Sequence, residues 1–150
     1  MCLEPVKSFF LAVCPIAVGL LLIAAAFAKV RSPGVASEVI DAALGTPAPA
    51  WAVLALSVGE LCLGVALLVP TLRSGAMPTA AVFFVGAIGV LVLARARGHA
   101  GGCGCFGRFS PSINATVALD GAIVAACGLW FLVFSERRDR HAEDPLEDRG

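Results

Sequence analysis

Long apolar stretches, separated by short polar connections, dominate the pattern of this chain. Four of them reach about 18 residues or more, the length that an α-helix needs to cross the hydrocarbon of a bilayer. They predict membrane-spanning helices at about residues 8–28, 51–69, 77–94 and 113–134. The predicted fold is therefore an all-α, polytopic membrane four-helix bundle, in a single domain at residues 1–134.

The first apolar stretch also resembles a signal peptide, because Ala26-Phe27-Ala28 has the form of a cleavage site after a basic start. The apolar core of a signal peptide is usually about 7–15 residues long. This stretch is longer and is followed by further spans, so we expect it to be retained as the first transmembrane helix.

Two regions outside the predicted spans are more polar than the spans. Residues 35–44 carry apolar side chains at helical spacing, which fits a short amphipathic helix at the interface and equally well an ordinary polar connection. The tail from Ser135 is dense in charges of both signs, which is typical of a disordered segment.

Composition agrees with a lipid bilayer as the environment. Of the 150 residues, 59% are hydrophobic and 15% are charged, and the formal net charge is zero. A neutral chain gives no indication of nucleic-acid binding. We predict no bound cofactor and no metal, and the sequence leaves the oligomeric state open.

Residues 98–112 form a glycine-rich stretch that holds Cys103 and Cys105, separated by one glycine. This stretch is too rich in glycine for a helix and too polar for lipid, so it predicts an exposed loop that presents two thiols. A disulfide between such close neighbours is strained, and strained, exposed disulfides tend to be exchanged rather than kept.

Three interpretations of the Cys103–Cys105 pair stay open at this stage. The pair could be catalytic in thiol–disulfide exchange, it could bind Cu(I) with a nearby histidine, or it could only staple the loop. The other cysteines inside the apolar stretches, Cys14, Cys62 and Cys127, indicate ordinary packing of a small apolar side chain.

Two carboxylic acids, Glu60 and Asp120, fall inside predicted spans. A charged side chain in hydrocarbon costs about 2.5 kcal/mol or more, so it usually faces the bundle interior and marks a function. Both lie roughly 10–15 Å below the membrane face that carries the cysteine loop, at a rise of about 1.5 Å per residue. We expect them to form a polar cluster with Lys29 or Arg97, as a functional site or as a polar contact between helices.

Four spans place both chain ends on one side of the membrane and the cysteine loop on the other. Basic residues are nearly balanced between the two sides, so the positive-inside rule alone does not fix the orientation. The densest basic cluster, Arg137, Arg138 and Arg140, favours a cytoplasmic tail. We therefore predict that the loop faces the extracytoplasmic side of a bacterial plasma membrane.

The order of these features resembles the methylamine utilisation MauE family, which is itself similar to the DoxX-like four-helix membrane proteins. The matching elements are the Ala28-Lys29 pair at the end of the first span, ELCLG at residues 60–64, and CGCFG at residues 103–107. The resemblance covers about residues 8–134.

This resemblance implies a protein that supports the maturation of methylamine dehydrogenase, whose small subunit carries many disulfides. Cys103 and Cys105 would exchange disulfides with a periplasmic thioredoxin-like partner, as part of a membrane thiol–disulfide oxidoreductase. The alternatives are a non-redox scaffold or assembly factor, and a small permease or metal-handling protein that uses Glu60 and Asp120.

Overall fold

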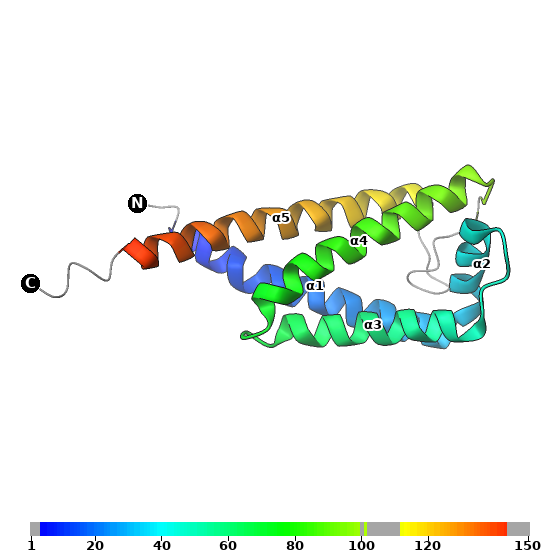
Figure 1. Cartoon of the computed structure of the whole chain (residues 1–150), viewed down its shortest axis with the longest axis horizontal. Helices are drawn as coiled ribbons and strands as arrows, with labels where there is room; N and C mark the ends of the chain where they lie inside the picture. The colour runs from blue at the N-terminus through cyan, green and yellow to red at the C-terminus, as the bar shows by residue number, and fades with distance from the viewer. Residues whose placement is uncertain (1–3, 100, 102–111, 144–150) are drawn as a thin grey trace, which may run out of the picture.

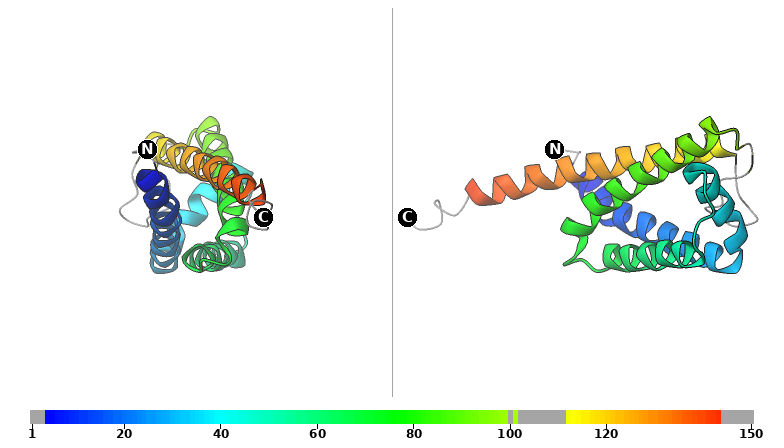
Figure 2. Two further views of the ribbon diagram at one scale, coloured as in Figure 1. Left: turned by 90° about the vertical axis from the view of Figure 1, so that its left-hand side faces the viewer. Right: turned by 45° about the vertical axis from the view of Figure 1, so that its right-hand side comes forward.

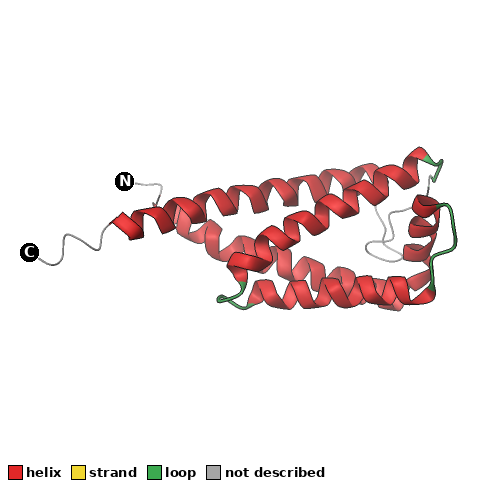
Figure 3. Ribbon diagram, in the orientation of Figure 1, coloured by secondary structure: helices red, strands yellow, loops and turns green. Residues whose placement is uncertain are grey.

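The computed structural model describes residues 4–99, 101 and 112–143. These residues form five α-helices and no strand (Figure 3). The helices are α1 (Glu4–Arg31), α2 (Pro33–Leu44), α3 (Ala50–Leu68), α4 (Arg73–Ala96) and α5 (Ile113–Glu143). All except α2 are long and apolar enough to cross a membrane, which confirms the predicted all-α membrane bundle.

The four long helices run alternately in opposite directions, so that consecutive ones are antiparallel (Figure 1). α1 packs most extensively against α3, and α4 against α5. α4 begins beside α3 and ends beside α5, and both ribbon views show it slanting across the bundle (Figures 1 and 2). α3 and α4 therefore diverge towards the end of the bundle that α2 covers.

The short helix α2 lies across this end of the bundle, so the connection between the first two spans is helical. Its Ala36, Val39 and Ala43 are buried, while Glu38 faces outwards. The helix ends at Gly45, whose φ of 74° is a left-handed conformation that glycine adopts without strain.

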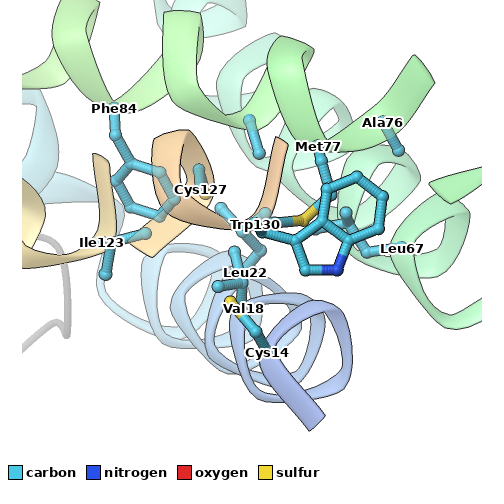
Figure 4. Close-up of a cluster of buried hydrophobic side chains, with 11 residues drawn as sticks. Cys14, Val18, Leu22, Leu67, Ala76, Met77, Phe84, Ile123, Cys127 and Trp130 are labelled. Carbon is cyan, nitrogen blue, oxygen red and sulfur yellow. The ribbon is translucent and has the colours of Figure 1, made fainter. Parts of the chain in front are cut away.

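A core of buried apolar side chains joins the four long helices (Figure 4). Lipid tails are as apolar as these side chains, so close packing and polar contacts between helices must hold the bundle together. The core comprises Cys14, Val18, Leu22, Leu67, Ala76, Met77, Ala80, Phe84, Ile123, Cys127 and Trp130.

α1 and α3 approach each other closely at Gly19 and Gly64. A Cβ atom added at either glycine would lie 2.8 Å from the backbone oxygen of the other. Small residues that allow backbones to approach in this way are the usual contact between membrane helices. Gly64 therefore has a packing role within the ELCLG segment.

A hydrogen bond across the core ties α5 to α1. Pro15 lacks an N–H, which leaves the carbonyl of Leu11, four residues earlier, without its helical donor. The indole Nε1 of Trp130 donates to this carbonyl at 3.0 Å. Trp130 of α5 therefore supplies the hydrogen bond that Pro15 removes from α1.

This pairing gives a double-mutant prediction. Trp130→Phe should destabilise the protein by about 1 kcal/mol through the lost hydrogen bond, in addition to the cost of the smaller ring. In a Pro15→Ala background, residue 15 supplies an N–H to Leu11, so the same change at Trp130 should cost less. Denaturation in mixed micelles measures both values, and equal costs in the two backgrounds would contradict the pairing.

The charged tail differs from the expectation of disorder from Ser135, because α5 continues through Glu143. No proline or glycine interrupts residues 135–143, and their glutamate, arginine and alanine residues are favourable helix formers. Residues 144–150 lie outside the described part of the chain.

Candidate functional site

A buried ion pair joins the end of α1 to the middle of α3. Lys29 Nζ lies 2.7 Å from Glu60 Oε1 and donates a second hydrogen bond to Oε2 at 2.9 Å. Each side chain is only 5% exposed. Glu60 was expected to face the interior of the bundle with Lys29 or Arg97 near it, and the structure brings Lys29 into direct contact with it.

The ion pair compensates two charges that would be costly alone in this environment. An unpaired charge within a bilayer costs several kcal/mol, and a carboxylate that accepts two hydrogen bonds from an ammonium group avoids much of this cost. α2 covers the pair, since its Ala36 and Val39 line the same space as Lys29. The first connection therefore keeps Lys29 buried although it lies in the last turn of α1.

Asp120 of α5 borders the same interior space. Lys29, Glu60 and Asp120 line one small cavity of about 30 Å³, together with Phe83 and Phe84 of α4. A cavity of this size can hold a water molecule between polar groups. The structure therefore gathers three predicted polar residues from α1, α3 and α5 around one point.

Arg97, the other basic residue expected near the carboxylates, lies elsewhere. Its Nη1 is 2.7 Å from the position that a Cβ atom on Gly45 would occupy. This places the guanidinium group at the carboxyl end of α2, where a cation is favourable for the helix dipole. Of the two candidates, Lys29 is thus the one that pairs with Glu60.

A larger pocket of about 490 Å³ opens beside the ion pair, where α3 and α4 diverge beneath α2. Among its described lining residues, Lys29 and Glu60 are the charged ones and the others are apolar. Phe83 and Ala87 line both this pocket and the small cavity. This pocket could not be predicted from the sequence, because helical spacing does not reveal the angle between two helices.

The five cysteines that lie in or between the spans divide into three groups. Cys103 and Cys105 lie outside the described residues, so their predicted roles stay predictions. Cys14 and Cys127 are buried in the core, as expected of packing residues, whereas Cys62 is exposed on α3.

His99 lies a few residues before the two cysteines in the chain. Its Nε2 atom is buried and has no hydrogen-bond partner within the described structure. An imidazole nitrogen in that situation can still accept or donate one hydrogen bond.

The fold and its buried charges define a small integral membrane protein built as a four-helix bundle with an interior polar cluster. Residues 7–134 match the family described as Methylamine utilisation protein MauE. The chain belongs to this family, and it is a membrane protein of methylamine utilisation. No curated protein and no solved structure matches the chain.

Proposed function

We propose that this protein exchanges disulfides with a thioredoxin-like partner through Cys103 and Cys105, in support of methylamine dehydrogenase maturation. The observation that carries the proposal is the family match over residues 7–134, which includes the CGCFG element. A pair of thiols in a glycine-rich segment suits exchange, because small neighbours leave room for an incoming thiolate.

The topology of the bundle supports a role outside the lipid for this segment. It leaves α4 after Ala96 and meets α5 at Ile113, at the end of the bundle that α2 covers. α1 begins and α5 ends at the opposite end, where Lys7 and Glu136 form an ion pair at 3.6 Å. The two cysteines thus belong to a connection between spans.

The exchange itself is a balanced two-electron reaction. A thiolate of one protein attacks the disulfide of the other, a mixed disulfide forms, and the second cysteine of the attacking pair releases it. One protein gains a disulfide and loses two electrons and two protons, and the other gains two thiols. The same steps serve either direction of electron flow.

We further propose that the segment faces the extracytoplasmic side of a bacterial plasma membrane. The basic cluster of Arg137, Arg138 and Arg140 follows the last span and favours a cytoplasmic end for α5. Disulfides persist on the oxidising side of such a membrane, where a periplasmic partner would meet the loop.

Single-cysteine variants test both proposals in one experiment. One of the two single variants, Cys103→Ser or Cys105→Ser, should trap the partner as a mixed disulfide through its remaining cysteine. The trapped species should run as a higher band on a non-reducing gel and should disappear with reductant. In intact cells the remaining loop thiol should react with a membrane-impermeant maleimide, provided that the cysteines outside the loop are replaced.

The scaffold alternative predicts a different result for the same set of variants. A protein that only assembles its partners would form no mixed disulfide, and the double serine variant would support full methylamine dehydrogenase activity. Labelling of the loop thiol only after cell lysis would reverse the proposed orientation.

A further inference from the structure

The 490 Å³ pocket between α2, α3 and α4 has the size and lining of a ligand site. Small-molecule sites are typically about 300–1,000 Å³, mostly apolar, with a few polar groups that orient the ligand. Here the apolar walls come from three helices, and the Lys29–Glu60 pair supplies the polar groups. Nothing in the proposed thiol exchange uses this pocket.

The pocket opens sideways, towards the lipid. Val82 of α4 and Leu44 of α2 line it and are 73% and 58% exposed. Val82 lies near the middle of α4, which is a membrane-spanning helix. Exposed apolar side chains at this position would face lipid tails, so a ligand would reach the pocket from within the bilayer.

At the polar end, the Lys29 ammonium group has one N–H donor more than the two that Glu60 accepts. An ammonium group carries three N–H donors in all. A carbonyl oxygen is the simplest group that could accept the third, and Glu60 beside it could exchange a proton with a reduced ligand.

We propose that this pocket binds the head group of an isoprenoid quinone. A quinone combines a flat ring with carbonyl acceptors and an apolar tail, which matches the apolar walls, the Lys29 donor and the lateral opening. Phe83 offers an aromatic ring on the wall that both cavities share. The quinone is an exchangeable reactant from the bilayer and not a resident cofactor.

The choice of a quinone over other amphiphiles rests on the proposed thiol function. Oxidation of two thiols to a disulfide releases two electrons and two protons, and a quinone takes up two of each to become a hydroquinone. The pocket also lies towards the end of the bundle at which α4 ends and α5 begins, which the chain segment with Cys103 and Cys105 connects. Leu91, which lines it, precedes Ala96 at the end of α4 by roughly 8 Å along the helix axis.

Two glycines of α4 offer a matched pair of variants. Gly86 lines the pocket and Gly89 does not, and a Cβ atom added at either would meet nothing within 4 Å. Gly86→Leu should fill the pocket without disturbing the helix contacts, and Gly89→Leu should add the same side chain outside it. Comparable thermal stability of the two variants without ligand establishes that both are folded.

The experiment titrates the purified protein in lipid nanodiscs with decylubiquinone and follows its unfolding midpoint. The wild type and Gly89→Leu should show a saturable rise, and Gly86→Leu should lose at least about tenfold in affinity. Decylbenzene, with the same tail and no carbonyls, should bind at least about tenfold more weakly than decylubiquinone, because it cannot accept the Lys29 hydrogen bond.

The quinone site would be rejected if decylubiquinone shows no saturable binding, or if Gly86→Leu binds it as tightly as the wild type does. It would also be rejected if decylbenzene binds as tightly as decylubiquinone, because the pocket would then accept any apolar chain. The Cys103→Ser/Cys105→Ser variant should bind decylubiquinone as the wild type does. Binding without partner trapping would therefore reject the thiol exchange alone, and trapping without binding would reject the quinone site alone.

Discussion

Replacement of Lys29 by methionine should destabilise the bundle by about 3–5 kcal/mol, because it leaves the Glu60 carboxylate buried without a partner. Glu60 is 5% exposed and accepts both hydrogen bonds from Lys29. Denaturation in mixed micelles, with helicity as the signal, measures the change.

The double variant Lys29→Met/Glu60→Met should recover most of this loss, since two apolar side chains can replace a buried ion pair at little cost. A control is Lys7→Met, which removes a pair whose side chains are 33% and 58% exposed. It should cost less than about 1 kcal/mol. Equal effects of the changes at Lys29 and Lys7 would show that the buried pair contributes no more than a surface pair.

Gly64→Ala should destabilise the protein by about 2–3 kcal/mol, because the added methyl group has no room between α1 and α3. The new Cβ would lie 2.8 Å from the backbone oxygen of Gly19, which cannot move without moving the helix. The two helices would have to separate at this contact.

Gly59→Ala is the matched control on the same helix, since a Cβ atom there meets nothing within 4 Å. Alanine is the better helix former by about 1 kcal/mol, so this variant should be as stable as the wild type or more stable. The two substitutions are chemically identical, but only Gly64→Ala is predicted to lower the stability. A loss of stability at Gly59 as large as that at Gly64 would reject the close crossing.

The spans could be predicted from the sequence because the bilayer imposes a length and a composition on each of them. The polar cluster was partly predictable as well, since a charge within a span must find a partner. The sequence placed Glu60 and Asp120 at similar depth, but it left Lys29 and Arg97 as alternatives. The depth of a residue in the membrane follows from counting residues along its span. The direction in which its side chain points around the helix depends on how the helices pack, which the sequence alone does not give.

The pocket and the helix crossings could not be predicted in the same way. The divergence of α3 from α4 depends on crossing angles, which arise from contacts such as Gly19 with Gly64. The proline at residue 15 did carry a local signal, because it frees the carbonyl of Leu11. Its donor, Trp130, is distant in the chain and could not be identified without the fold.

The most direct test of the proposed function is a redox titration of Cys103 and Cys105 in a variant without other cysteines. The fraction of oxidised pair is measured by thiol alkylation and mass spectrometry at a series of dithiol–disulfide buffer potentials. A bridge over so short a segment restrains the unfolded chain very little and is strained, so it should be easily reduced. We expect a midpoint well above about −300 mV, the level below which structural disulfides typically lie. A pair that stays oxidised below that level would be a permanent staple and would contradict the exchange function.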